Sequence, residues 1–570
     1  MSARTALVCL GALIGGATAL AEPQPRAPAP DPPDAPTTLP APFAAVAFEN
    51  RSGVGGLDWL TTALPFVLAD KLEAHPGLRS VGGPLAVADD AAGATLVFRG
   101  RFARPNWRLE LTVSLERDGR LVGEETRRGD FSDCFEMVED AAATLLARAG
   151  EPLPEAAQAR FRRRPTRDFY AFTLFGRGVH ALAQGGDPAA AVKSLERATF
   201  IDPRLAEAHR ALAVAWERLG QPGKARGQLA YALELRPDSY WPVALLARAA
   251  RAAKDRDEAM DLAVRALALR PWDTDMRYLL GEMLWEEGDA PRALRELQRV
   301  TRAAPDHLAA RRILVLVHAS AGNLEDLVAE LTKIVELDPA DVDARVDLGA
   351  AEEALGRDDA AVAAYRAVIA VRPRHVQALK LLGDLARRRG DLAQAIAWYE
   401  GAVKANRDDP RAYFLLGSAY SLAGMTDKAL RIYLQAQRFS RYLPETYSNL
   451  GALYYRKGSN DEALWYLRAA STSRPDNPRI HYNYGLALAR AHARDRALGE
   501  FLRATELQPD DAEMRFALGV AYLRLGQVDA AEKAFAEAIR LDPEHEGARQ
   551  NLKVLDELRR KATDGEVQVE

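Results

Sequence analysis

Charged, amide and aromatic side chains that could recognise a ligand recur along residues 380–490 of this 570-residue chain. An arginine guanidinium group can bind a carboxylate through two parallel hydrogen bonds, an asparagine amide can hold a peptide backbone, and an aromatic ring offers rigid contact area. This chemistry binds a ligand without transforming it, and it suits an extended acidic peptide. The candidate recognition residues are Lys380, Arg387, Arg388, Arg411, Phe414, Asn449, Tyr455, Arg456, Tyr482, Asn483 and Arg490.

A plainer interpretation of some of these residues stays open. Asn449 and Asn483 are 34 residues apart, so they can simply reflect an internal repeat. Arg387 and Arg388 can serve to neutralise the C-terminal end of a helix, where the backbone carbonyl groups carry partial negative charge. The sequence alone does not separate the two interpretations.

No signature of catalysis accompanies these residues. The chain has no HExxH motif, no paired-cysteine metal site, no Gly-x-Ser-x-Gly elbow and no Gly-Lys-Ser/Thr phosphate loop. The glycine-rich stretch NRSGVGGLD at 50–58 lies between an expected strand and an expected helix, but Asp58 stands where a dinucleotide loop needs its third glycine. A tight turn is favoured there, and we predict no enzymatic activity, no cofactor and no metal.

A 34-residue period organises the chain from about residue 172 onward. Counting back from Pro543 in steps of 34 residues gives proline at nine of eleven positions, the exceptions being Arg407 and Arg441. A constant period of this size is typical of stacked repeats that are each a pair of antiparallel helices. At the two exceptions, Pro410 and Pro444 can occupy the first position of the next helix, where a missing N–H costs nothing.

Small residues recur at fixed positions within the period. The eighth position is glycine in seven of eleven units and the twentieth is alanine in ten, whereas the twenty-fourth is usually leucine, tyrosine or phenylalanine. The small residues should let two helices approach closely, and the large ones should fill the adjacent core. Val315, Leu327 and Ile334 replace the small residues in unit 308–341, which predicts wider helix spacing there. The units begin at Phe172, Ala206, Tyr240, Thr274, Leu308, Val342, Val376, Pro410, Pro444, Pro478 and Ala512.

These units resemble tetratricopeptide repeats, whose consensus contains W-x2-L-G-x2-Y, A-x3-F-x2-A and a final proline. The resemblance implies a mostly α fold: a right-handed α-solenoid of about eleven helix pairs over residues 172–545. It also implies that positions 2, 5, 6, 9, 12 and 13 of each unit face a concave groove, which is how the candidate recognition residues are selected. A capping helix at 546–562 and a tail at 563–570 should follow the array.

The first residues are typical of an export signal. An apolar run follows Arg4, and Ala19-Leu20-Ala21 forms a small-x-small cleavage pattern, so we expect a signal peptide at 1–21 and a periplasmic or secreted protein. No segment predicts a membrane span. Residues 22–42 are a proline-rich linker, expected to be a stiff tether. Cys134 is the single cysteine after the signal, so no intramolecular disulfide is expected.

Residues 43–150 predict a small α+β domain. Alternating segments at 95–102, 107–116 and 120–127 predict strands, and Asp118-Gly119 predicts a hairpin turn between the last two. Pro65 interrupts the pattern of an expected helix. The stretches FENRSG, LADKLEAHPGLRSV and DFSDCFEMVEDAAATLL resemble TolB-like amino-terminal domains, which implies an interaction module. An arginine-rich connecting segment at 151–171, expected to be a solvated hinge, leads to the repeats.

The overall charge excludes one class of partner. A formal net charge of −4 and a pI near 6.2 argue against nucleic acid, because a protein that binds the phosphate backbone needs a strong basic excess. The sequence therefore predicts a non-enzymatic periplasmic scaffold that binds protein or peptide partners, among them acidic ones, in a groove of the repeat array. The alternative is an accessory subunit of an envelope or polysaccharide assembly or export machinery, in which the groove binds a glycan or an enzyme complex of the envelope.

Overall fold

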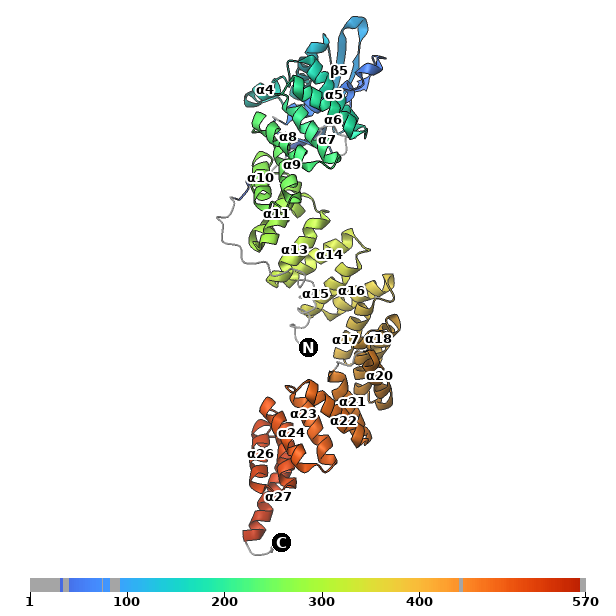
Figure 1. The fold of residues 1–570 in the computed structure, drawn as a ribbon, viewed down its shortest axis with the longest axis vertical. Helices are drawn as coiled ribbons and strands as arrows, with labels where there is room; N and C mark the ends of the chain where they lie inside the picture. Colours follow the sequence, from blue (N-terminus) through green and yellow to red (C-terminus); the bar gives the residue numbers. More distant parts are fainter. Residues whose placement is uncertain (1–30, 34–39, 74, 82–92, 440–443, 564–570) are drawn as a thin grey trace. The chain divides into compact units, whose positions relative to one another are not determined.

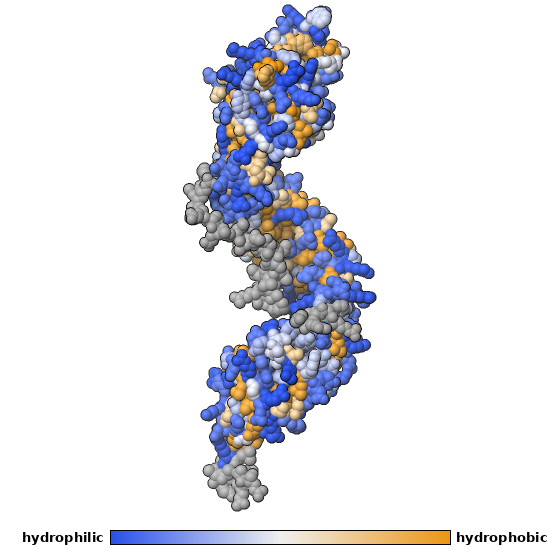
Figure 2. All heavy atoms as spheres, in the orientation of Figure 1, coloured by the Kyte–Doolittle hydropathy of each residue, from blue (hydrophilic) through white to orange (hydrophobic). Residues whose placement is uncertain are grey.

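The computed structural model describes residues 31–33, 40–73, 75–81, 93–439 and 444–563 (Figure 1). The expected signal peptide, most of the linker and the tail after Thr563 lie outside these residues. The chain divides into two compact units, one ending at Ala321 and the other beginning at Gly322, and each is described by itself. On the face drawn in Figure 2, hydrophilic residues predominate and hydrophobic ones form scattered patches.

The first unit begins with a small α+β domain built on a mixed sheet of six strands. The strand order is β3-β1-β4-β5-β6, with β2 paired to β4; β1, β2 and β3 make parallel pairs, and β4, β5 and β6 form an antiparallel meander. Asp118 and Gly119 both have positive φ, of 50° and 76°, which confirms the predicted hairpin turn. The strands are β1 (Ala41–Ala45), β2 (Glu49–Asn50), β3 (Leu78–Ser80), β4 (Leu96–Ala103), β5 (Leu109–Arg117) and β6 (Arg120–Gly129).

Two helices cover this sheet, α2 (Leu60–Leu72) and α3 (Cys134–Arg148). Pro65 lies inside α2, where its ring nitrogen cannot donate to the carbonyl of Thr61. That carbonyl instead accepts a hydrogen bond of 2.8 Å from the backbone N–H of Phe48. The helix continues through the proline because a neighbouring loop satisfies the acceptor that the proline leaves free.

The repeats of the first unit start with α5 (Phe169–Ala183), earlier than the expected Phe172, because the side chain of Asp168 caps the helix by accepting from the backbone N–H of Ala171. The connecting segment before it contains a short helix, α4 (Glu155–Phe161). The remaining helices of this unit are α6 (Pro188–Ile201), α7 (Ala206–Arg218), α8 (Pro222–Leu235), α9 (Tyr240–Ala252), α10 (Arg256–Leu269), α11 (Thr274–Glu287), α12 (Ala290–Ala303) and α13 (Leu308–Ala321).

The second unit contains helical repeats and a terminal helix. The division between the units falls inside repeat 308–341, so the predicted wider helix spacing in that repeat stays a prediction. The helices are α14 (Leu324–Leu337), α15 (Val342–Ala354), α16 (Asp358–Val371), α17 (Val376–Arg388), α18 (Leu392–Ala405), α19 (Pro410–Leu422), α20 (Thr426–Phe439), α21 (Pro444–Lys457), α22 (Asn460–Ser473), α23 (Pro478–Arg490), α24 (Arg494–Leu507), α25 (Ala512–Arg524), α26 (Val528–Leu541) and α27 (Glu546–Thr563). A mostly α fold, with a solenoid-like array of helix pairs after a small α+β domain, is thereby confirmed.

Glycine at the eighth position makes room for the large residue at the twenty-fourth. A Cβ atom built on Gly349 or Gly383 would lie 2.4 Å from the ring of Tyr365 or Tyr399, closer than any real contact. Both tyrosines are fully buried. The small residues therefore serve packing between the two helices of a unit, and the aromatic residues fill the core as predicted.

Two kinds of contact recur after the terminating proline, each in several units but not in all of them. Two residues after it, Asp, Asn or His caps the next helix; His375, for example, accepts from the backbone N–H of Ala378. Six residues after it, an Arg or His side chain binds the proline carbonyl, as Arg277 does to Pro271 at 2.9 Å. The same contact is made by His209, Arg311, His481, Arg515 and Arg549.

Candidate recognition surface and a buried ion network

The candidate recognition residues lie on the first helices of four successive repeats, α17, α19, α21 and α23, in the second unit. Several contact the neighbouring first helix. Arg456 of α21 donates to the hydroxyl of Ser421 in α19 at 2.9 Å, and the guanidinium of Arg490 in α23 stacks 3.5 Å from the ring centroid of Tyr455 in α21. These side chains therefore form one surface that runs from repeat to repeat, which we call the first-helix face.

On α17, acidic partners neutralise the basic side chains. Lys380 pairs with Asp409 at 3.0 Å, and Arg388 pairs with Glu353 at 2.8 Å and with Asp358 at 3.4 Å. Arg387 lies 3.8 Å from Asp384 on the same helix. The charge of these three cations is therefore already compensated within the protein.

Arg411, Arg456 and Arg490 differ, because none has a carboxylate partner among the described residues. All three are exposed. Arg411 stacks on Phe414, with the guanidinium carbon 5.2 Å from the ring centroid, and Arg490 also donates to the backbone carbonyl of Tyr455. Stacking holds the guanidinium groups of Arg411 and Arg490 in place, and the hydrogen bond to Ser421 holds that of Arg456; none of these contacts neutralises the charge. The described part of α19, α21 and α23 thus offers three fixed positive charges to a ligand.

The two equivalent asparagines also differ. Asn449 donates to the hydroxyl of Tyr433 at 2.9 Å, and burial raises the pKa of that tyrosine to about 12. Asn483 follows a unit whose twenty-fourth residue is Leu467, which has no hydroxyl, and its amide has no hydrogen-bond partner among the described residues. Asn483 is therefore able to bind a peptide backbone, whereas Asn449 is held by the core. Nearby, Tyr482 donates to Glu513 at 3.2 Å.

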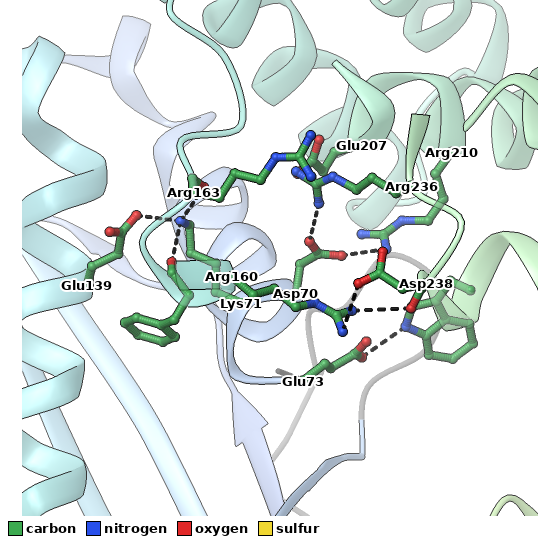
Figure 3. Close-up of polar contacts among 12 residues, drawn as sticks. Asp70, Lys71, Glu73, Glu139, Arg160, Arg163, Glu207, Arg210, Arg236 and Asp238 are labelled. Atoms are coloured by element: carbon green, nitrogen blue, oxygen red, sulfur yellow. Dashed lines mark hydrogen bonds and ion pairs between the residues drawn. The ribbon is translucent and has the colours of Figure 1, made fainter. Parts of the chain in front are cut away.

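A second polar cluster, not predicted from the sequence, joins the small domain to the first repeats (Figure 3). Asp70 on α2 binds Arg210 at 2.7 Å and Arg236 at 3.1 Å, and Arg236 also pairs with Glu207 at 2.5 Å. Burial alone would raise the pKa of the Asp70 carboxyl, but the two arginines outweigh this effect and hold that pKa below its usual value. Directly after the end of α2, Glu73 pairs with Arg270 and accepts from the indole N–H of Trp241.

Lys71 fastens the connecting segment to the same helix (Figure 3). Its ammonium group pairs with Glu139 at 2.5 Å and donates to the carbonyls of Phe161 and Arg163, both at 2.7 Å. Burial lowers the pKa of Lys71 and raises that of Glu139, and their mutual attraction opposes both shifts. The segment expected to be a solvated hinge is thus held by a buried ion pair.

An aromatic core completes the junction between the small domain and the repeats. Trp59, before α2, packs edge-to-face on Phe172 of α5 with ring centroids 5.4 Å apart, and Phe66 packs in the same way on Phe175 at 5.3 Å. A Cβ on Gly176 would lie 2.2 Å from the Trp59 ring, so glycine is required for this approach. The small domain and the first repeats therefore share one hydrophobic core.

Among the described residues, no group of three or more His, Cys, Asp or Glu side chains is placed to hold a metal ion. None of the described helices is both long enough and apolar enough to cross a membrane. The thiol of Cys134 is buried, which raises its pKa to about 12 and makes it a poor nucleophile.

Comparison with solved structures finds several matches of low sequence identity. A structure described as YrrB, a TPR protein with an unusual peptide-binding site, is 23% identical, with 34% of this chain and 99% of that chain covered and a TM-score of 0.31. The Cut9–Hcn1 hetero-tetramer of the APC/C is 14% identical over 74% of this chain and 93% of that chain, with a TM-score of 0.34. Pseudomonas aeruginosa pilF is 20% identical, with 36% of this chain and 95% of that chain covered and a TM-score of 0.33. No curated protein matches this chain.

Family models described as tetratricopeptide repeat match the array along most of its length. The matched residues are 177–240, 250–315, 328–369, 346–410, 412–441, 449–504 and 493–546. Together they cover more than half of the chain, and they agree with the helix pairs, the small eighth residue and the terminating proline described above. The chain is therefore a member of the tetratricopeptide repeat proteins, a family that mediates protein–protein interaction.

Proposed function

We propose that this protein is a non-enzymatic periplasmic scaffold that binds an extended acidic segment of a partner protein along the first-helix face of α19, α21 and α23. The observation that carries the proposal is the contrast between α17, whose cations are paired, and the next three first helices. There Arg411, Arg456 and Arg490 have no carboxylate partner among the described residues. Charge-assisted hydrogen bonds from arginine to carboxylate are among the stronger polar contacts available to such a surface.

Backbone recognition would come from Asn483, whose amide has no partner among the described residues. An extended peptide presents alternating N–H and C=O groups, and a side-chain amide can satisfy both. Tyr455, stacked under Arg490, supplies rigid contact area beside it. Specificity for carboxylates would then depend on the arginines, and the asparagine would fix the register of the peptide backbone on the surface.

Charge reversal tests this proposal. The full mature chain carrying Arg411→Glu, Arg456→Glu and Arg490→Glu would serve as bait for affinity purification from intact envelopes. A matched control carries Arg366→Glu, Arg431→Glu and Arg468→Glu, which change the net charge equally but lie exposed on the second helices α16, α20 and α22. We expect the first variant to lose partners that the control and the unmodified chain retain. Retention of every partner by the first variant would refute the binding surface.

A direct assay complements the purification. A short labelled peptide of alternating glutamate and glycine should bind the unmodified chain and the control, and bind the triple variant at least about tenfold more weakly, because three charge-assisted contacts become repulsive. Asn483→Ala should lower the affinity for the peptide without changing the salt dependence of binding, because the substitution removes no charge. Equal binding by all variants would contradict the assignment.

The alternative, an accessory role in envelope or polysaccharide assembly or export, has one observation in its favour. Trp465 on α22 is 59% exposed and packs against Tyr466, with ring centroids 4.7 Å apart, and Tyr447 of α21 lies beside both rings. Exposed aromatic faces of this kind can stack on sugar rings. Binding of envelope polysaccharide that is lost on Trp465→Ala, but not on reversal of the arginines, would favour the alternative.

Localisation and the identity of the small domain belong to the same proposal. The amino-terminal pattern of an apolar run before Ala19-Leu20-Ala21 supports export to the periplasm. The resemblance of residues 43–150 to TolB-like domains supports an envelope context. Fractionation of cells, followed by mass determination of the mature amino terminus, tests the first point: an uncleaved cytoplasmic chain would contradict it.

A further inference from the structure

A segment of the proline-rich linker lies on the repeats of the first unit. The carboxylate of Asp31 binds Arg292 at 2.9 Å and Arg295 at 3.2 Å, both on α12. The carbonyl of Pro33 accepts from Arg277 of α11 at 2.7 Å. Pro32, between them, is buried. More than two hundred residues of chain separate the segment from the helices that it contacts, so the contact is not a consequence of sequence proximity.

The arginine that receives Pro33 is held in place before the segment binds. Arg277 is 2% exposed; its guanidinium also binds the carbonyl of Pro271 and pairs with Glu296 at 2.6 Å. Glu296 is itself buried and accepts from Arg299 at 2.6 Å. A donor fixed by this many contacts loses little freedom on binding, which favours recognition.

The chemistry of the segment matches that of the site. Pro32 and Pro33 have no backbone N–H, so these two residues present hydrogen-bond acceptors and no donors, whereas a guanidinium group presents donors and no acceptors. Proline also restricts the unbound segment to extended conformations, which lowers the entropy lost on docking. The Asp31 side chain adds the charge that pairs with Arg292 and Arg295.

We infer that α11 and α12 form a recognition site for an acidic proline segment of the type Asp-Pro-Pro, and that residues 31–33 of the same chain occupy it. Residues 31–33 of the linker are therefore bound to the repeats, although the composition of the linker alone predicts a stiff free tether. The site uses other helices than the first-helix face, and it does not depend on that face binding a partner.

A labelled peptide with the sequence of residues 27–36, APAPDPPDAP, tests the inference against the full mature chain. In the unmodified chain the site is occupied and the peptide should bind weakly. Asp31→Lys should release the segment in cis and increase peptide affinity by about tenfold or more, measured by fluorescence anisotropy. The same affinity for both chains would overturn the occupation of the site by residues 31–33.

Two further variants in the Asp31→Lys chain locate the site. Arg295→Glu should lower the affinity for the peptide by about tenfold. Arg302 is exposed on the same helix and makes no contact with residues 31–33, so Arg302→Glu should change that affinity by less than about twofold. An equal loss of peptide affinity in both variants would mean that the peptide is held by general charge attraction, which would overturn the proposed site. Light scattering completes the test: a dimer that Asp31→Lys converts to a monomer would mean that a second copy supplies the segment, which contradicts occupation in cis.

Discussion

The buried carboxylate of Asp70 should dominate the stability of the junction between the small domain and the repeats. In Asp70→Ala, Arg210 loses its partner while its side chain stays 3% exposed, and Arg236 keeps only Glu207. Removing one member of a buried ion pair costs about 3 to 5 kcal/mol, because the remaining charge is left without compensation. We therefore expect a loss of this size in the free energy of opening α2 from the repeats.

Hydrogen exchange followed by mass spectrometry measures this loss locally. Amides of α2 should exchange about two to four orders of magnitude faster in Asp70→Ala, since each tenfold change corresponds to about 1.4 kcal/mol. The matched control is Asp140→Ala, which removes an ion pair of 3.7 Å between Asp140 and Arg162, whose side chains are 52% and 67% exposed. Because so exposed a pair contributes little, this variant should change the exchange rate by less than about tenfold. Equal protection in both variants would refute the reasoning.

The pH dependence of the same junction has a defined sign. The pKa of Asp70 is lower in the folded chain than its ordinary value, so the contribution of Asp70 to stability is fully present above that ordinary value, near 4, and is lost as pH falls through the folded value. The exchange of α2 amides in the unmodified chain, corrected for the intrinsic pH effect, should therefore accelerate in acid. Asp70→Asn should show a smaller acceleration.

Further predictions concern the repeats. Gly383→Ala should destabilise the second unit by about 1 to 3 kcal/mol in urea denaturation, because its Cβ would overlap the Tyr399 ring; the double variant with Tyr399→Leu should recover part of this loss, and no recovery would mean that the ring is not the obstacle. Asp347 has a pKa raised to about 6 by burial and by Asp343 and Asp341, so its contribution to stability is lost as pH rises from about 4 to 6. Asp347→Asn should be more stable than the unmodified chain by about 1 to 3 kcal/mol at pH 7 and equal to it below pH 4, and a gain that is the same at both pH values would contradict the assignment. His481→Leu removes hydrogen bonds to the Pro475 carbonyl and to Glu500, and it should cost about 1 to 2 kcal/mol; an unchanged urea midpoint would show that this contact is dispensable.

The periodic part of the fold could be predicted from the sequence because it depends on local rules. A helix that must end at a fixed proline and pack through a fixed glycine has its phase set by those residues, so the first helices of most repeats begin where the spacing places them. Predictions at irregular positions are less exact: α5 begins at Phe169 rather than at the expected Phe172 because Asp168 caps it, and the connecting segment expected to be a solvated hinge contains α4.

The contacts missed from the sequence are those between distant segments. No period indicates that Asp70 binds Arg210 or that Asp31 binds Arg292, because each partner is one of many charged residues and only the tertiary fold brings the two together. One signal was available in the sequence: an Arg or His six residues after the terminating proline recurs in several units, and its side chain binds that proline's carbonyl. The candidate recognition residues were found by position, but their pairing state could not be, since it depends on side chains one repeat away.

The pairing state of the arginines supports a division of roles along the chain. In the first unit, acidic groups of other segments of the chain pair with some of the arginines of the repeats: Asp70 and Glu73, in and just after α2, bind Arg210 and Arg270, and Asp31 of the linker binds Arg292 of α12. In the second unit, Arg411, Arg456 and Arg490 have no carboxylate partner among the described residues. In the first repeats, therefore, arginines bind acidic groups that other segments of the same chain supply. If the chemistry is general to this array, a partner's carboxylates should bind the second unit in the way that the chain's own carboxylates bind the first.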